Sequence, residues 1–289
     1  MLLPWLDLPD APARLATWSE LTGLDLLGLG STGTAEQIRD TAVAQPLLTA
    51  AALLTAQALL GDDVPDAVCG HSVGELSALA IAGVLTPEEA VSLAAVRGAA
   101  MAQAAAARPT GMAAVLGGDA EQVLEAVAAA DLTVATVNVA GQVVVGGTSE
   151  ALAAFAAAPP AGARVRPLDV AGAFHTAAMA PAAEALESAV RTLRPGAPRC
   201  AVVANADGAV VPDGAALLAR LVGQLTGPVR FDRCLAGLAA QGVTAAVELA
   251  PGGTLAGLAK RALTGATVVA LKAPADLETA RELRAAVPA

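Results

Sequence analysis

The pattern of hydrophobic and polar positions divides the chain into three stretches. The first is helical in pattern around a short apolar segment at 67–69, and it contains a long uncharged run at 42–60. That run has the length of a membrane span, but polar residues and a proline interrupt it, and many of its apolar residues are alanine. We therefore expect a buried helix and no membrane segment; the interrupting residues are Gln45, Pro46, Thr49, Thr55 and Gln57.

A second helix in this stretch has a clear N-terminal signal. Thr86 is placed to cap it, Pro87 suits its first turn, and Glu89 completes a capping box with Thr86. The apolar pattern then continues to about residue 107, before Pro109. We predict one long helix over this segment.

The spacing of the hydrophobic residues changes at Thr110. Short alternating or β-branched runs follow, separated by two amphipathic segments. The resulting order of strand, helix, strand, strand, helix, strand is that of a ferredoxin-like unit, so we predict a small subdomain at 109–170. Its expected strands cover residues 111–116, 132–138, 142–146 and 164–170, and its expected helices cover 120–130 and 149–157.

The third stretch alternates helical patterns with short apolar runs. Such alternation is typical of a mostly parallel sheet covered by helices on both faces. The fold class is therefore α/β, with a core formed by residues 1–108 and 171–289. The helices expected here cover 178–193, 215–225, 231–240 and 254–263, and the strands cover 200–205, 244–249 and 267–271.

Composition narrows the class of protein further. Of the 289 residues, 55% are hydrophobic and only 15% are charged, which indicates a packed globular protein. The formal net charge of −10 argues against a nucleic-acid-binding protein, which normally needs a basic face. Three scattered cysteines give neither a disulfide framework nor a metal-binding spacing. The first residues lack the basic start of a signal peptide, so we expect a cytoplasmic protein with reduced thiols and no metal.

The pentapeptide Gly70-His71-Ser72-Val73-Gly74 is the strongest sign of chemistry. It fits the G-x-S-x-G pattern, and it lies between a candidate strand and a helical pattern at 75–82. A serine on such a turn has an exposed hydroxyl beside the free N–H groups of a helix N-terminus. The pattern also occurs by chance in chains rich in glycine and alanine, but its context favours a nucleophile.

The candidate base for Ser72 is His175. The chain has only two histidines, and His71 adjoins the serine, so its side chain should point away across the turn. A serine hydroxyl needs a base within hydrogen-bond reach to act as a nucleophile. A serine hydrolase would also need an acidic residue to orient the histidine, and the nearest one in sequence, Asp169, is poorly placed for that role. The lack of a suitable acid weakens the interpretation as an esterase. It fits an enzyme in which a carbonyl or amide orients the imidazole.

Arg97 and a glycine-rich run at 28–33 each have more than one interpretation. Arg97 lies in an alanine- and valine-rich helical segment; it is either a snorkelling surface residue or a buried guanidinium that can hold a carboxylate through two hydrogen bonds. The run 28–33 fits the G-x-G-x-x-G pattern, but a leucine-rich segment precedes it and no acid follows at the usual spacing. We do not expect a dinucleotide site there.

These motifs together resemble the malonyl-CoA:acyl carrier protein transacylase family, over nearly the whole chain and in the same order. The likeness extends to Asn138-Val139-Ala140-Gly141-Gln142 and to residues 224–231. The other segments that carry it are Gly70-His71-Ser72-Val73-Gly74-Glu75, Val96-Arg97-Gly98, Gly172-Ala173-Phe174-His175 and Pro251-Gly252-Gly253-Thr254-Leu255.

The resemblance implies an α/β-hydrolase-like core with a ferredoxin-like insert, and it implies a role for each matched residue. Ser72 would be malonylated with His175 as its general base, and Arg97 would hold the malonyl carboxylate. A main-chain carbonyl near Gln224 would orient His175, and the backbone N–H of Val73 would stabilise the oxyanion. Asn138 would line the cleft, and Phe174 would favour malonyl over branched acyl groups.

The resemblance also implies the substrates: malonyl-CoA as donor, the phosphopantetheine thiol of an acyl carrier protein as acceptor, and no bound cofactor. Family members begin with a strand and a Gly-Gln-Gly loop that supplies another oxyanion donor, and this sequence starts just past that point. We expect a start codon placed too late rather than an impaired form.

The alternatives are a serine esterase or thioesterase on the same core, and an inactive paralogue that only binds carrier protein. An acidic carrier would need a local basic patch on this acidic chain. Lys260 and Arg261 are candidates, as are Arg191, Arg194 and Arg199. The default oligomeric state is a monomer.

Overall fold

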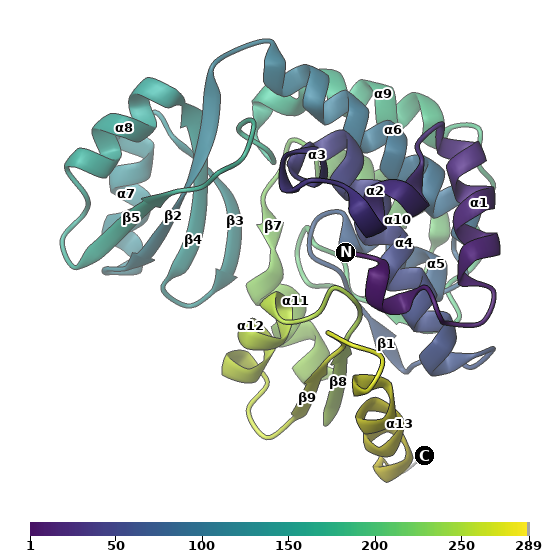
Figure 1. The fold of residues 1–289 in the computed structure, drawn as a ribbon. Coiled ribbons are helices and arrows are strands. Elements are labelled where there is room, and N and C mark those ends of the chain that lie inside the picture. Colours follow the sequence, from purple (N-terminus) through teal and green to yellow (C-terminus); the bar gives the residue numbers. More distant parts are fainter. Residues whose placement is uncertain (288–289) are drawn as a thin grey trace.

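A computed structural model describes residues 1–287. A layer of helices forms the N-terminal part of the molecule, and α4 and α6 pack against each other at its centre (Figure 1). The helices of this part are η1 (Leu3–Trp5), α1 (Ala11–Thr22), α2 (Leu26–Thr32), α3 (Ala35–Arg39), α4 (Thr41–Leu60), α5 (Gly74–Ile81) and α6 (Pro87–Ala106), with β1 (Ala67–Val68) before α5.

The long apolar run is confirmed as a core helix. By length and composition α4 could cross a membrane, but 61% of its apolar window is buried inside the described structure. Its neighbour α6 begins as predicted: Oγ1 of Thr86 accepts a hydrogen bond from the N–H of Glu89 at 3.1 Å, and the Glu89 carboxylate accepts one from the N–H of Thr86 at 2.8 Å. Gln45 lies on α4 and Arg97 lies on α6.

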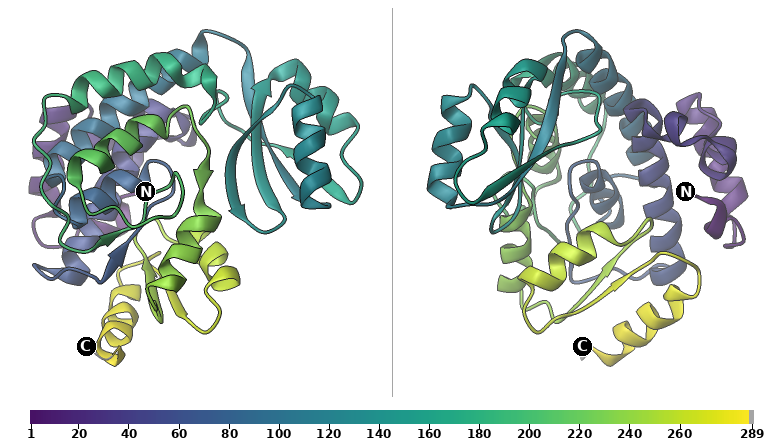
Figure 2. Two further views of the ribbon diagram at one scale, coloured as in Figure 1. Left: turned by 180° about the vertical axis from the view of Figure 1, so that it is seen from behind. Right: turned by 60° about the vertical axis from the view of Figure 1, so that its left-hand side comes forward.

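The middle of the chain forms a five-stranded sheet that stands beside the helical layer (Figures 1 and 2). Its strand order, β5-β2-β4-β3-β7, contains the ferredoxin-like arrangement that was predicted, and all pairs are antiparallel except β3–β7. The elements are β2 (Thr110–Gly117), α7 (Ala120–Ala129), β3 (Thr133–Val139), β4 (Gln142–Thr148), α8 (Ser149–Ala157), β5 (Ala163–Pro167) and the edge strand β7 (Val229–Arg230).

The two faces of this sheet have different neighbours. Val115 and Val145 face a small apolar core that also contains Val123 of α7 and Phe155 of α8. The opposite face carries a second apolar cluster of Met112, Ala135 and Val144, against which Phe174 packs. Because β-strand side chains alternate between faces, this second face is free to border the site.

The core strands are short parallel pairs. β1 pairs with β6 (Ala201–Val202), and β8 (Ala245–Glu248) pairs with β9 (Thr267–Ala270). The strand expected over 200–205 is shorter than predicted, because Val203 instead makes an antiparallel bridge to Val210 around a turn. The remaining helices are η2 (Ala177–Met179), α9 (Ala180–Val190), α10 (Gly214–Gly223), α11 (Phe231–Ala240), α12 (Thr254–Ala262) and α13 (Asp276–Ala286).

The α/β class with its ferredoxin-like insert is therefore confirmed, whereas the domain boundaries stay a prediction. The sheet of the insert recruits β7 from outside residues 109–170, so the boundary is not a clean cut. The glycine motif at 28–33 lies mainly in α2, and no strand precedes it. Gly30 meets a packing need instead, because a Cβ there would lie 2.4 Å from the Leu2 side chain.

Candidate active site

Ser72 stands on a tight turn between β1 and α5. Its φ of +55° lies in the left-handed region that non-glycine residues rarely adopt. The turn closes tightly enough that a Cβ on Gly70 would lie 2.0 Å from the backbone carbon of Gly74. Glycine is therefore required at position 70 on steric grounds, whereas Gly74 has open space around its Cβ direction.

The structure brings Ser72, His175 and Gln224 into one hydrogen-bonded chain. Oγ of Ser72 lies 2.7 Å from Nε2 of His175, and Nδ1 of His175 lies 2.7 Å from the main-chain oxygen of Gln224. A carbonyl oxygen can only accept, so Nδ1 carries the proton and Nε2 is free to accept one from Ser72. His175 also has a positive φ of +60°, in the same left-handed region as Ser72.

Arg97 is completely buried, which excludes the snorkelling interpretation. Its side chain is 1% exposed and reaches Ser72 from α6. Nη1 donates to Oε1 of Gln45 at 2.6 Å, and Nη2 donates both to Oε1 of Gln224 at 2.7 Å and to Oγ of Ser72 at 3.1 Å. Its Nε–H has no hydrogen-bond partner among the described residues, so the guanidinium has donor capacity to spare.

The surroundings set the charge states of these groups. Burial, with a smaller contribution from the nearby Arg97 charge, lowers the pKa of His175 to about 3, so its imidazole is neutral near pH 7. Burial also lowers the pKa of Arg97 to about 10, which leaves it a cation at neutral pH. The site therefore offers a neutral base and a fixed positive charge on either side of one hydroxyl.

A cavity of about 270 Å³ opens in front of Ser72. Asn138 lines it, as the family resemblance implied, together with Phe174, Leu168 and residues from the site-facing side of the five-stranded sheet. Nε2 of His71 donates to Oδ1 of Asn138 at 3.0 Å, so this second histidine is engaged away from the Ser72 hydroxyl. Asp169, the one acid near His175 in sequence, is instead paired with Arg39 on the surface at 2.8 Å.

Val73 precedes the first residue of α5, so its backbone N–H belongs to the group of donors at the helix N-terminus. Within residues 1–287 this N–H has no hydrogen-bond acceptor. It is therefore available to an oxyanion that forms beside Ser72.

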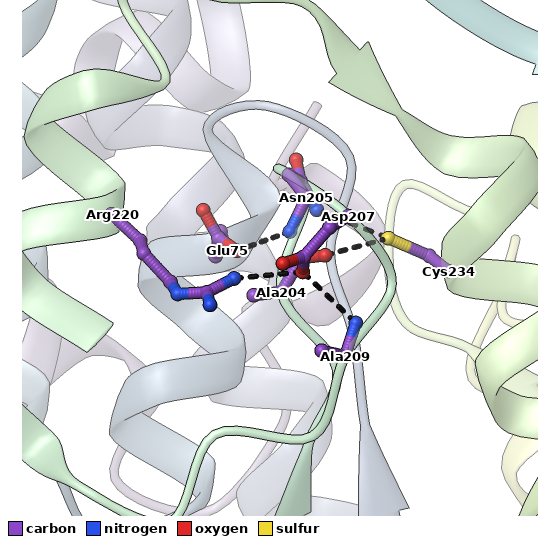
Figure 3. Close-up of polar contacts among 7 residues, drawn as sticks. All are labelled: Glu75, Ala204, Asn205, Asp207, Ala209, Arg220 and Cys234. Carbon is purple, nitrogen blue, oxygen red and sulfur yellow. Dashed lines mark hydrogen bonds and ion pairs between the residues drawn. The ribbon is translucent and has the colours of Figure 1, made fainter. Parts of the chain in front are cut away.

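Sequence reasoning missed two residues that hold this arrangement. Asn205, 1% exposed, follows β6 and accepts the N–H of Ser72 at Oδ1, 2.8 Å away; its Nδ2 donates to the carbonyl of Gly70. Gln45 supports Arg97 from α4. Figure 3 shows Asn205 between Glu75 and Cys234, with Arg220 reaching from the left toward Asp207. In the sequence Asn205 is only the last residue of the strand expected over 200–205, and Gln45 is only one of several polar residues in an apolar helix, so neither position pointed to the site.

The candidate docking cations lie at the surface, and two of them have local partners. Arg191 pairs with Glu187, and Arg261 donates to Gln142 at 2.7 Å. Arg261 also borders a second cavity, of about 370 Å³, that shares His71 and Asn138 with the first. Among the described residues no group of three or more His, Cys, Asp or Glu side chains is arranged to hold a metal ion.

A half-buried serine, an imidazole oriented by a carbonyl and a buried guanidinium beside them are features of an acyl-transferring serine enzyme. Residues 15–280 match the acyl transferase domain family, and the chain belongs to that family. Within it, the similarity is to malonyl CoA-acyl carrier protein transacylases, as the sequence resemblance predicted.

Three of these similarities define the relationship. The malonyl CoA-acyl carrier protein transacylase of Mycobacterium tuberculosis is 51% identical over 284 residues, which are 96% of this chain and 93% of that protein. A crystal structure of the Mycobacterium tuberculosis enzyme matches with a TM-score of 0.94 at 50% identity, covering 97% of this chain and 94% of that one. A type II PKS acyl-carrier protein in complex with its malonyl-transacylase matches with a TM-score of 0.89 at 33% identity, covering 98% and 94%.

Proposed function

We propose that this acyltransferase moves a malonyl group from malonyl-CoA to the phosphopantetheine thiol of an acyl carrier protein, through a malonyl ester on Ser72. The observation that carries the proposal is the position of Oγ of Ser72, 2.7 Å from the free nitrogen of a neutral imidazole and 3.1 Å from a buried guanidinium. The family and the relatives' names supply the acyl group and the acceptor.

In the first half-reaction, His175 takes the hydroxyl proton while Oγ of Ser72 attacks the thioester carbon. Charge develops on the thioester oxygen, and the N–H of Val73 donates a hydrogen bond to it. The carbon–sulfur bond then breaks, and the proton on His175 passes to the departing CoA thiolate. The product is a malonyl-serine ester and free CoA.

The second half-reaction repeats these steps with a different nucleophile. The phosphopantetheine thiol of the carrier gives its proton to His175 and attacks the ester carbon, and Ser72 recovers the proton as the carbon–oxygen bond breaks. The main-chain carbonyl of Gln224 holds the imidazole by Nδ1 throughout and carries no negative charge. The arrangement therefore supports acyl transfer without the acid of a hydrolase triad.

Arg97 selects the acyl group in this proposal. A malonyl carboxylate that reaches the buried guanidinium finds a complementary charge and an Nε–H donor that is still free. Phe174 and Asn138 border the same cavity, where a bulky ring limits room for branched acyl groups. We also propose a cytoplasmic, monomeric enzyme whose three cysteines are free thiols, and no bound cofactor.

The test is to incubate the protein with malonyl-CoA, with and without a holo acyl carrier protein, and to measure carrier thioester and free malonate. We expect malonyl-carrier to form rapidly and little malonate to appear without the carrier. Fast malonate release without carrier would indicate the esterase alternative. Carrier binding with no acyl transfer would indicate a binding protein, and either result would refute the proposal.

A further inference from the structure

The mechanism above leaves one buried carboxylate without a role. Glu75 is the second residue of α5 and is only 3% exposed. Its Oε1 accepts the backbone N–H of Asn205 at 2.8 Å, and its Oε2 accepts Nε2 of Gln224 at 2.7 Å. Figure 3 shows the first of these contacts. Both oxygens act as acceptors, which is the pattern of an ionised carboxylate.

The contact with Gln224 fixes the direction of its side-chain amide. Nε2 of Gln224 faces three acceptors: the Glu75 carboxylate, Oδ1 of Asn205 at 3.0 Å and the carbonyl of Ser72 at 3.2 Å. The amide oxygen must therefore point the other way, and it accepts Nη2 of Arg97 at 2.7 Å. A reversed amide would place an NH₂ group against the guanidinium, where neither side can accept.

Glu75 is also the charge that balances Arg97, although the two do not touch. The carboxylate and the guanidinium each contact the amide of Gln224 from opposite ends, so one neutral side chain separates the two charges. The other cation near Glu75, Arg220 of α10, is already paired with Asp207 at 2.7 Å (Figure 3). Hydrogen bonds through Gln224 therefore link Glu75 to Arg97 in the site, and not to Arg220.

We propose that Glu75 is a positioning residue for acyl selection: by holding the amide of Gln224 in one direction, it holds Arg97 in the orientation that receives the acyl carboxylate. This inference rests on the proposed function, because it assumes that Arg97 binds a malonyl group. It adds a residue that touches no substrate and acts through Gln224.

The informative substitution is Glu75→Gln, which keeps the size of the side chain and removes its charge. One oxygen of the new amide can still accept the N–H of Asn205, but its NH₂ then faces the NH₂ of Gln224. Gln224 must reverse to relieve this contact, and Arg97 loses its acceptor. The malonyl-CoA reaction should suffer more than the acetyl-CoA reaction, because acetyl has no carboxylate for Arg97 to hold.

The experiment compares kcat/KM for Ser72 acylation by malonyl-CoA and by acetyl-CoA in the wild type, Glu75→Gln, Glu75→Asp and the surface control Glu184→Gln. We expect Glu75→Gln to lower the malonyl value about tenfold to a hundredfold, the loss of one charge-assisted hydrogen bond, and to change the acetyl value much less. Glu75→Asp, which keeps the charge, should recover part of the loss, and Glu184→Gln, exposed on α9, should match the wild type. An equal loss for both substrates, or none, would overturn the proposal.

A pH profile of the wild type tests the same idea without a substitution. Burial raises the pKa of Glu75 to about 7, against the opposing effects of the Asn205 N–H, Arg97, Gln224 and Arg220. Protonation below that pH removes the charge and turns one of the two accepting oxygens of Glu75 into a donor, which weakens its hold on Gln224. We therefore expect kcat/KM for malonyl-CoA to fall as the pH drops through 7. Of the other titratable groups nearby, His175 has a pKa of about 3 and Arg97 a pKa of about 10; burial lowers the pKa of His71 below its usual value, and burial raises the pKa values of the Cys69 and Cys234 thiols.

Acetyl-CoA is the control for this profile, because it carries the same CoA phosphates. We expect the acid limb near pH 7 with malonyl-CoA only, and we expect Glu75→Gln to lack it. The same limb with both thioesters, or its persistence in Glu75→Gln, would refute the role of Glu75. If malonyl-CoA does not acylate the wild-type serine at all, the proposed function fails instead, so the two failures are distinguishable.

Discussion

Replacing Arg97 with methionine removes the cation from the acyl pocket while keeping an unbranched side chain of similar length. The site is already crowded by Met101 on the same helix and by Gln45, so a flexible apolar side chain should fill most of the space. The variant loses three hydrogen bonds of the guanidinium, to Gln45, Gln224 and Ser72. Two of these are independent of the substrate, and the third contacts the nucleophile.

The expected magnitude follows from the burial of Arg97. Its side chain is 1% exposed, so a malonyl carboxylate that enters the mutated pocket is a desolvated charge without a partner. Leaving one member of a buried ion pair alone costs about 3–5 kcal/mol, which is a factor of roughly a hundred to a few thousand at about 1.4 kcal/mol per tenfold. We therefore expect kcat/KM for malonyl-CoA to fall by that factor relative to acetyl-CoA.

The assay is rapid-quench measurement of acyl-Ser72 with each thioester, in the wild type and in Arg97→Met. The ratio of the two rates is decisive, because losing the contact with Ser72 slows both reactions alike. Arg166→Ala, an exposed arginine on β5, is the matched control and should leave the ratio unchanged. A malonyl-to-acetyl ratio that stays at the wild-type value in Arg97→Met would refute the reasoning.

Three further predictions concern the turn, the base and the pocket. Gly70→Ala should abolish acylation and lower the thermal unfolding midpoint, because its Cβ would lie 2.0 Å from backbone, whereas Gly74→Ala has open space and should fold normally; equal effects would contradict the tight turn. In the wild type, His175 should lower the free energy of unfolding by about 2 kcal/mol as the pH falls from 6.5 to 5, because the unfolded chain binds a proton there and the native His175, with a pKa of about 3, does not. His175→Gln should lack this loss of stability, which denaturant titrations at both pH values measure. The same pH dependence in both proteins would argue against a buried neutral imidazole. Phe174→Ala should raise kcat/KM for methylmalonyl-CoA relative to malonyl-CoA, since Phe174 borders the cavity; an unchanged ratio would exclude it as a steric limit.

The elements that could be predicted from the sequence were those with local signals. The capping box at Thr86 and Glu89 gave the start of α6, and the change of period at Thr110 gave the ferredoxin-like strand order. The strand near residue 201 was overestimated because its apolar run continues into a turn, where Val203 bridges to Val210. Periodicity reports which residues are apolar, but it does not show where the chain turns back.

The site residues that could be predicted from the sequence were likewise those with a local signal. Ser72, with its flanking glycines, has a local pattern, and His175 could be chosen because the chain has so few histidines. Asn205 and Gln45 could not be found, because their importance lies in contacts with Ser72 and Arg97 across 133 and 52 positions. The burial of Arg97 was also undetermined, since a snorkelling arginine has the same sequence pattern.

Malonylation of Ser72 is the central claim, and peptide mass mapping tests it most directly. The protein is mixed with malonyl-CoA, quenched in acid within the first turnover, digested and analysed, with and without a chase of holo acyl carrier protein. We expect a malonyl group on the peptide that contains Ser72, absent in Ser72→Ala and removed by the chase. A wild-type peptide that stays unmodified, or an adduct that the carrier does not discharge, would contradict it.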